Sequence, residues 1–216
     1  MPETQIGGLP VSGRKSAYVL RNRQGIIKAA QQVLAHQGSA ASIEEIAAQA
    51  EVSVSTVYKH FSSKDDLITA AFQTAMQTWE SWMKAQLADT ADSLEKLVLP
   101  MCLFIRAKET HPIFAAMVAK NPSEATSRLK SLGETLTLDL QALQEAGVLR
   151  IEDVSLRGEL LMAVLVHVSQ KVYFDSIFTL ENADGAIAIA LGLLGVDPST
   201  ARSLVSSPIS LIQIQS

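Results

Sequence analysis

The sequence has 216 residues, of which 48% are hydrophobic and 19% are charged. This length and composition allow one large or two smaller hydrophobic cores, and they exclude a chain that is disordered throughout. The formal net charge of −4 argues against a protein that coats nucleic acid over its whole surface.

The first residues predict a flexible arm. Residues 1–16 contain three glycines, two prolines and little periodic apolar content, a composition typical of mobile termini. These glycines, with Arg14 and Lys15, interrupt the apolar run that a signal peptide requires. The longest apolar stretch, 186–196, has 11 residues, well below the roughly 20 that a membrane span needs. We therefore expect a cytoplasmic protein without a membrane partner, and the single cysteine, Cys102, fits a reducing compartment as a buried core residue.

Residues 17–65 have the pattern of three short helices. Apolar residues from Ile26 to Leu34 recur at the spacing of one helical face, and Gly38 lies where a helix stop is expected. Ser42 then opens S-x-x-E, the capping box in which each side chain bonds the other residue's backbone N–H. Ser53 is a suitable cap for a third helix soon afterwards.

A long helix begins next. Ser63 with Asp66 repeats the capping pattern, and apolar residues then recur with helical spacing, which predicts a helix from about 64 to 86. Further helical patterns follow at 94–108, after Pro112, and at 123–146, 154–178 and 183–194. The tail, 206–216, fits a strand, a short helix or a docked extension. The expected fold class is all-α, with an N-terminal three-helix domain and a helical bundle over 66–216.

A short capped helix, a tight turn and a second short helix form a helix-turn-helix, which presents its second helix to a DNA major groove. After Ser53 the sequence runs VSTVYKH, which offers hydroxyls, an ammonium and an imidazole without any carboxylate. The charge of the chain is also uneven. Residues 1–64 hold seven Lys or Arg and four Asp or Glu, a balance of +3, whereas the remainder holds eleven and eighteen, a balance of −7. The N-terminal domain is therefore the part expected to approach a polyanion.

The run from Ile26 to Leu67 includes AAQQVLAHQG and SIEEIAAQAEVSVSTVYKHFSSKDDL. It resembles the N-terminal DNA-binding domain of the TetR family of bacterial transcription regulators. The resemblance is carried by the IA pair, the VS break, the Y-x-H-F end of the third helix and the following S-K-x-x-L. Glu51 departs from it, because family members often have glycine in this turn. A non-glycine residue is awkward there if the backbone needs a positive φ.

The helix composition and the resemblance together give a set of expected DNA contacts. Ser55 and Thr56 are expected at base edges or nearby phosphates, and the resemblance implies phosphate contacts for Tyr58, Lys59 and Lys64. The full set is Ser42, Ser53, Val54, Ser55, Thr56, Tyr58, Lys59, His60 and Lys64, with Arg14, Lys15, Arg21 and Arg23 of the arm.

Several of these residues have a second interpretation. Val54 either touches a thymine methyl or packs inward, and His60 either contacts the DNA backbone or satisfies local hydrogen bonds. Ser42 acts as a cap, alone or together with a phosphate contact at the helix N-terminus. The basic residues of the arm approach the minor groove or backbone, or form a solvated charge cluster.

For the body, the resemblance implies a ligand-binding and dimerisation domain. A homodimer would hold two DNA-binding domains about 34–36 Å apart on a palindromic operator. The segments 156–174 and 186–194 are the candidates for the dimer contact, with monomer core as the alternative. Candidate ligand contacts are the large adaptable side chains Trp79, Trp82, Met83, Phe104, Met117, Met162, His167 and Phe174. Among them His167 stands out, because a polar group on an apolar helix needs a partner.

The implied function is a ligand-responsive transcriptional regulator, most often a repressor in this family, that a small apolar or amphipathic effector releases from DNA. In the alternative, the body binds a protein partner or no ligand. An enzyme is disfavoured because the sequence lacks a Glu-x-x-His pair, H-E-x-x-H, a Gly-x-Ser-x-Gly elbow and a phosphate-binding glycine loop. No catalytic residue, metal or cofactor is expected.

Overall fold

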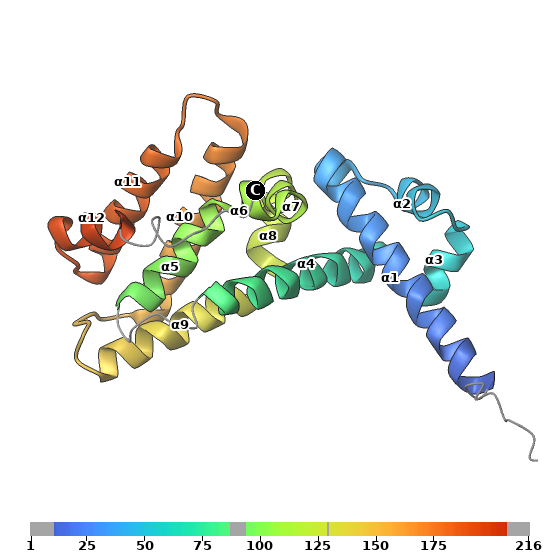
Figure 1. Cartoon of the computed structure of the whole chain (residues 1–216), viewed down its shortest axis with the longest axis horizontal. Helices are drawn as coiled ribbons and strands as arrows, with labels where there is room; N and C mark the ends of the chain where they lie inside the picture. Colours follow the sequence, from blue (N-terminus) through green and yellow to red (C-terminus); the bar gives the residue numbers. More distant parts are fainter. Residues whose placement is uncertain (1–10, 87–93, 129, 207–216) are drawn as a thin grey trace, which may run out of the picture.

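The computed structural model describes residues 11–86, 94–128 and 130–206, and its regular structure within these ranges is entirely helical. The predicted all-α class is confirmed. Figure 1 shows the three N-terminal helices at one end, the remaining helices at the other, and the long helix α4 between them. The first four helices are α1 (Val11–Gln37), α2 (Ile43–Gln49), α3 (Val54–His60) and α4 (Lys64–Gln86).

The body consists of eight further α-helices within the described ranges. They are α5 (Leu94–Ile105), α6 (Ala107–Thr110), α7 (Pro112–Lys120), α8 (Pro122–Arg128), α9 (Lys130–Glu145), α10 (Val154–Phe174), α11 (Leu180–Leu191) and α12 (Pro198–Ser206). Two short 3-10 turns, η1 (Gly38–Ala40) and η2 (Gly192–Leu194), follow α1 and α11. Among the helices that the structure describes, none combines enough length and apolar content to cross a bilayer.

Helix α1 begins earlier than the sequence suggested. Residues 11–16 were expected in a flexible arm, but they form the first turns of α1, and residues 1–10 lie outside the described ranges. The physical reason is cooperativity: a helix that is already nucleated from residue 17 onward extends at little cost. Gly13 lowers helix stability by about 1 kcal/mol without breaking the chain of hydrogen bonds.

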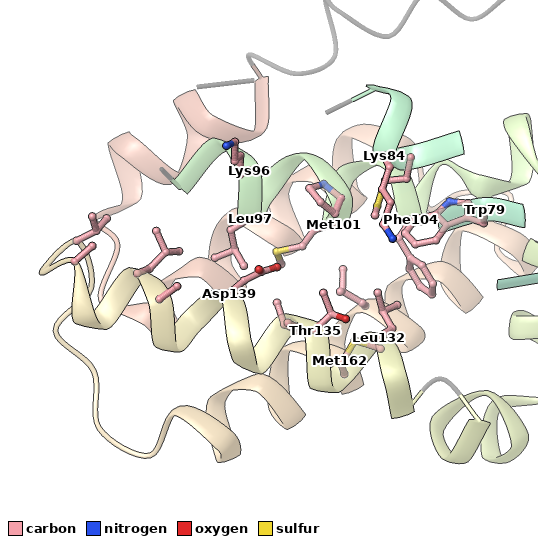
Figure 2. Close-up of a pocket in the computed structure, with 18 residues that line it drawn as sticks. Trp79, Lys84, Lys96, Leu97, Met101, Phe104, Leu132, Thr135, Asp139 and Met162 are labelled. Carbon is pink, nitrogen blue, oxygen red and sulfur yellow. The ribbon is translucent and has the colours of Figure 1, made fainter. Parts of the chain in front are cut away.

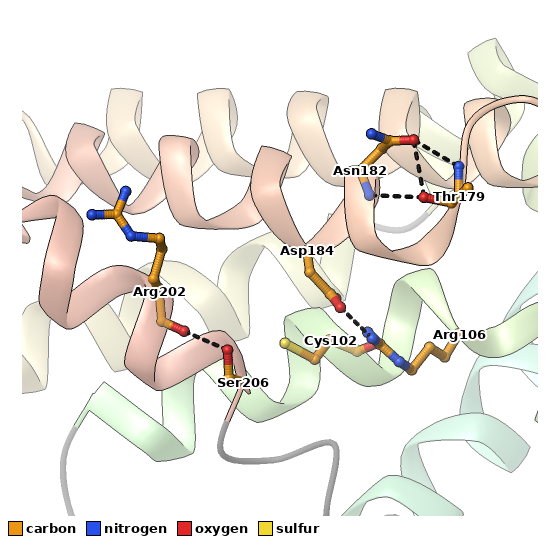
Figure 3. Close-up of polar contacts among 7 residues, drawn as sticks. All are labelled: Cys102, Arg106, Thr179, Asn182, Asp184, Arg202 and Ser206. Atoms are coloured by element: carbon orange, nitrogen blue, oxygen red, sulfur yellow. Dashed lines mark hydrogen bonds and ion pairs between the residues drawn. The ribbon is translucent and has the colours of Figure 1, made fainter.

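Helix boundaries in the body also differ from the expected ones. Helix α10 ends at Phe174 instead of 178, and α11 begins at Leu180 instead of 183. The earlier start comes from a capping box in which Thr179 and Asn182 bond each other's backbone N–H groups, as Figure 3 shows. Helix α12 was not predicted, and the undecided tail from 207 on lies outside the described residues.

The N-terminal helices contact the body directly as well as through α4. At the end of α7, Lys120 Nζ donates to the carbonyl of His36 over 2.9 Å, and the buried Asn121 side chain donates to the carbonyl of Leu34 over 3.4 Å. Both carbonyls belong to the last turn of α1, which Gly38 terminates with φ 67°. The C-terminal ends of α1 and α7 therefore form one junction.

A partly buried ion pair connects Arg106, the residue that follows α5, to α11. Arg106 Nη2 lies 2.6 Å from Asp184 Oδ2, and Arg106 Nη1 donates to the carbonyl of Cys102 (Figure 3). The Cys102 side chain is fully buried, as expected, and burial raises the pKa of its thiol to about 12. The pair thus joins the end of α5 to α11, the helix that follows α10.

Candidate functional site

The helix-turn-helix is built from two local caps. Ser42 accepts from the backbone N–H of Glu45 over 3.2 Å, while Glu45 accepts from the backbone N–H of Ser42 over 2.9 Å, so the predicted capping box is confirmed. These hydrogen bonds lower the pKa of the Glu45 carboxyl. Ser53 caps α3 by accepting from the N–H of Thr56. Both helices therefore start where local side-chain chemistry places them.

The turn between α2 and α3 requires a left-handed residue. Glu51 has φ 55°, and the hydrogen bonds Glu51 N to Ala48 O and Val52 N to Ala47 O complete a Schellman motif at the end of α2. This motif favours glycine at the position that Glu51 occupies. The departure noted in the sequence is thus a strained backbone position in the structure.

Helix α3 has one buried face and one exposed face. Val57 is fully buried, whereas Ser55, Tyr58 and Lys59 are exposed. Val54 is half-buried and packs against the core, which favours inward packing among its two interpretations. The exposed face therefore carries a hydroxyl, a phenol and an ammonium without a carboxylate.

Other candidate contacts of α3 are already engaged in local bonds. The Thr56 and Ser55 hydroxyls each lie 2.9 Å from the hydroxyl of Ser53, and His60 is half-buried at the helix end. The hydroxyl of Ser42 donates to Glu45, so its capping interpretation holds and a phosphate contact would compete with that bond. The hydroxyls of Ser53, Ser55 and Thr56 therefore form one cluster at the start of α3.

The basic residues of α1 lie in different surroundings. Arg21 is exposed, but the guanidinium of Arg23 stacks over the ring of Phe61 at 4.8 Å from its centroid. Arg14 and Lys15 belong to the first turns of α1. Arg23 thus also helps to pack α1 against the end of α3.

The start of α4 differs in detail from the expected capping box. The N–H of Asp66 donates to Ser63 Oγ over 3.0 Å, as predicted, but the Asp66 carboxylate accepts from the N–H and hydroxyl of Ser62. Half-buried Lys64 is the first residue of the helix. The cap therefore spans two serines and holds Lys64 next to the end of α3.

A second candidate site lies in the body. An apolar cavity of about 570 Å³ opens between α4, α5, α9 and α10, and Figure 2 shows the side chains around it. Trp79 forms part of the wall and packs edge-on against Phe104, with ring centroids 5.7 Å apart. The volume lies within the range of about 300–1,000 Å³ that is typical of small-molecule sites.

Half of the predicted ligand contacts line this cavity and half do not. The four that line it are Trp79, Met83, Phe104 and Met162. Among the others, Trp82 packs on the ring of His111, Met117 is fully buried elsewhere in the core, and His167 and Phe174 are exposed. The expectation that His167 has a polar partner inside the fold is therefore not supported by its position.

The cavity also contains polar residues that the sequence did not single out. These are Lys84, Lys96, Thr135 and Asp139. Their residue types do not distinguish them from residues on the solvated face of an amphipathic helix. Asp139 differs from such a residue because partial burial raises the pKa of its carboxyl.

A third feature is an exposed apolar face on α10 and α11. Leu156, Leu160 and Phe174 of α10 are 52%, 43% and 61% exposed, and Ile189 of α11 is 81% exposed. With His167, the α10 residues recur at intervals of four and seven, which places them on one stripe of the helix. Large apolar side chains that are exposed in this way are candidates for a contact surface.

Residues 26–71 match the family described as bacterial regulatory proteins, tetR family. The HTH-type transcriptional regulator HbdR of Aromatoleum sp. (strain CIB) is 28% identical over 123 residues, which are 55% of this chain and 54% of that protein. The chain therefore spans about half the length of this curated relative. That protein is described as a helix-turn-helix (HTH) type transcriptional regulator.

Two solved structures have a similar fold over most of the chain. RolR in complex with resorcinol superposes with a TM-score of 0.71 and 20% identity, covering 88% of this chain and 96% of that chain. FadR from Bacillus subtilis in complex with stearoyl-CoA gives a TM-score of 0.61 and 21% identity, covering 88% and 99%. These likenesses establish that the N-terminal helices and the helical body share one known arrangement.

Proposed function

Because the chain belongs to the TetR family of bacterial regulatory proteins, we propose that it is a transcriptional regulator that binds double-stranded DNA through α2 and α3. The observation that supports this proposal is the exposed face of α3. Ser55, Tyr58 and Lys59 point outward there, while Val57 packs into the core. Phosphate contacts from Tyr58, Lys59 and Lys64 would supply most of the affinity, and Ser55 and Thr56 would read base edges.

We assign DNA binding to residues 17–65 and regulation to residues 66–216. The regulator acts as a homodimer on a palindromic operator, with the exposed face of α10 and α11 as the contact between copies. A small effector enters the cavity beside α4 and tilts this helix. The tilt changes the separation of the two copies of α3. The effector can change the affinity for DNA only by as much as its own affinity differs between the two arrangements of the α3 helices.

The proposed sense of regulation is repression that the effector relieves, which is the sense that the family resemblance supports. The ligands in the RolR and FadR structures, resorcinol and stearoyl-CoA, support a small-molecule effector with a large apolar part. The apolar walls of the cavity in this chain are compatible with such a molecule.

Fluorescence anisotropy with the DNA upstream of the protein's own gene tests this proposal. Lys59→Ala should weaken binding about equally on all sequences and reduce the salt dependence, whereas Ser55→Ala should change the sequence preference. Lys28→Ala is the matched control, because Lys28 is an exposed lysine of α1 outside the proposed interface. The absence of any sequence-dependent, salt-sensitive binding would reject the proposal, and DNA binding that no small molecule changes would favour a protein partner instead.

A further inference from the structure

The N-terminal half of α1 has almost no contact with the hydrophobic core. Residues 16–25 are exposed except for half-buried Asn22, and Ile26 is the first buried residue after them. Figure 1 shows this half of α1 extending beyond α3, on the side away from the body. We call residues 11–25 of α1 the protruding half. At 1.5 Å per residue, this segment is about 22 Å long.

The protruding half carries positive charge without any acidic residue. The sequence contains no Asp or Glu from position 4 to position 43, whereas the protruding half contains Arg14, Lys15, Arg21 and Arg23. Arg21 and Arg23 are exposed, and neither forms an ion pair with another described residue. Such a segment attracts a polyanion, and a phosphate backbone gains affinity for it by releasing counterions.

The large apolar residues that are exposed on the protruding half do not form a face for a protein or membrane partner. Tyr18, Val19 and Leu20 are 60%, 46% and 56% exposed. Because they are consecutive, they project about 100° apart around the helix and share no side of it. A coiled-coil or membrane contact requires apolar residues three and four positions apart on one side. Charge is therefore the property that selects the partner of this segment.

The protruding half begins beside the proposed DNA surface. The guanidinium of Arg23 lies over the ring of Phe61, which is the residue that ends α3. Lys59, two residues earlier, is exposed on α3. Helix α3 has 7 residues and spans about 10 Å, whereas one turn of DNA is about 34 Å long. A duplex bound to α3 therefore continues beyond this helix.

The helical state of the protruding half determines which part of the duplex it can contact. An α-helix with its side chains is about 10–12 Å wide, and the minor groove of B-DNA is only about 6 Å wide. An extended arm could enter that groove, but residues 11–25 are helical. The phosphate backbone is therefore the accessible target.

On the premise that α3 binds operator DNA, we propose that the protruding half of α1 binds the phosphate backbone of the DNA that flanks each operator half-site. Arg14, Lys15 and Arg21 supply the contacts, while Arg23 keeps the helix attached to the end of α3. Because phosphates carry no sequence information, the contacts are independent of the flanking sequence. At 3.4 Å per base pair, the protruding half covers about six base pairs.

Two duplexes with the same centre test this proposal. Both contain the palindrome that the unsubstituted protein selects from the DNA upstream of its own gene. The short duplex ends at the limits of the palindrome, and the long one has about ten further base pairs at each end, which exceeds the reach of the protruding half. The long duplex should bind at least about tenfold more tightly at about 0.1 M salt.

Salt dependence and flanking sequence identify the kind of contact. The slope of log affinity against log salt should be steeper on the long duplex by about 2.7 for each bound copy, which is about 0.9 for each of three phosphate contacts. Replacing the flanking base pairs by another sequence should leave both differences unchanged.

Substitutions then assign these differences to α1. The triple variant Arg14→Gln, Lys15→Gln, Arg21→Gln should bind the two duplexes almost equally. Glutamine has nearly the helix propensity of arginine and lysine, so the helix should persist, and circular dichroism of the free protein checks this. Arg21→Gln alone should remove about 0.9 of the slope, on the long duplex only. Lys28→Gln is the matched control, because Lys28 is an exposed lysine of α1 outside the protruding half, and it should keep the full difference.

The outcomes separate this contact from the function on which it rests. Equal binding of both duplexes by the unsubstituted protein, or a difference that the triple variant retains, would overturn the contact by α1 and leave the DNA contact of α3 intact. If the triple variant weakens binding to both duplexes equally, its three residues contact the operator itself and the assignment to flanking DNA is wrong. Failure of the unsubstituted protein to bind either duplex would reject the proposed function and the flanking contact together.

Discussion

Glu51 holds a backbone position that favours glycine. Its φ of 55° costs a non-glycine residue about 1 kcal/mol or more, partly offset because glycine makes the unfolded chain more flexible. We expect Glu51→Gly to increase the free energy of unfolding by up to about 1 kcal/mol. Thermal and urea denaturation measure this change.

Glu51→Gln separates strain from charge. It keeps the Cβ atom and therefore the strain, so it should leave the free energy of unfolding almost unchanged. Both substitutions remove a negative charge beside the proposed DNA surface and should strengthen DNA binding, with the gain decreasing as salt is raised. Equal stabilisation by glutamine and glycine would contradict the backbone argument.

At the same scale, residues with local partners were predictable and residues with distant partners were not. The bonds between Ser42 and Glu45 span three residues, so the sequence alone predicts them. Asp139 and His167 each look like a polar residue on a helix. Their different surroundings depend on how α9 and α10 pack against the rest of the body, which no local pattern encodes.

The junction of α1 and α7 is the main element-scale contact between the N-terminal helices and the body. A Cβ atom on Gly38 would lie 2.9 Å from the carbonyl oxygen of Lys120. We expect Gly38→Ala to lower the free energy of unfolding through left-handed strain, about 1 kcal/mol, and through overpacking, about 1–3 kcal/mol. Urea denaturation measures the total loss.

Gly147→Ala provides the matched control for this junction. Gly147 also has a positive φ, 72°, but a Cβ atom there would have no neighbour within 4 Å. Gly147→Ala should therefore lower the free energy of unfolding by the strain contribution alone. If the two substitutions destabilise the protein equally, the close approach of α7 to α1 contributes nothing to stability.

Helix starts in the body illustrate which elements the sequence predicts. The start of α12 has a signal that could have been used, since the Asp197 carboxylate accepts from the N–H groups of Ser199 and Thr200 and Pro198 occupies the first helical position. The box of Thr179 and Asn182 is harder to recognise, because asparagine replaces the usual Glu or Gln. The break at Asn121 also has a local signal, because Pro122 follows it and the residue before a proline is disfavoured in a helix.

At the scale of the whole molecule, the proposed DNA surface and the cavity are connected by two routes. One is α4, which begins beside α3 at Lys64 and carries Trp79 and Met83 on the cavity wall. The other is α7, whose Phe114 stacks on Trp79 at a centroid distance of 5.7 Å and whose end bonds to α1. A ligand against Trp79 would therefore press on both elements that hold the N-terminal helices.

Such a displacement of the N-terminal helices affects operator binding only if contact with a second copy of the chain holds the body in place. The exposed face of α10 and α11 suits this contact, because Gly185 and Gly192 flank Ile189 at helical spacing and have open space at their Cβ positions. Small residues beside a protruding isoleucine let two copies approach closely. Around a two-fold axis the same face is used twice, so a single substitution changes the interface at two places.

Ile189→Lys should therefore convert the proposed dimer to a monomer of 23.2 kDa, because it places two ammonium groups in an apolar contact, where each costs several kcal/mol. Light scattering after size-exclusion chromatography measures the mass, and operator affinity should fall with it because one copy contacts only one half-site. Leu138→Lys is the control, since Leu138 of α9 is 64% exposed and lies outside this face. If Ile189→Lys remains dimeric while Leu138→Lys becomes monomeric, the dimer contact lies on α9. The two-fold axis would then pass beside α9, and effector binding would change the spacing of the α3 helices around that axis instead.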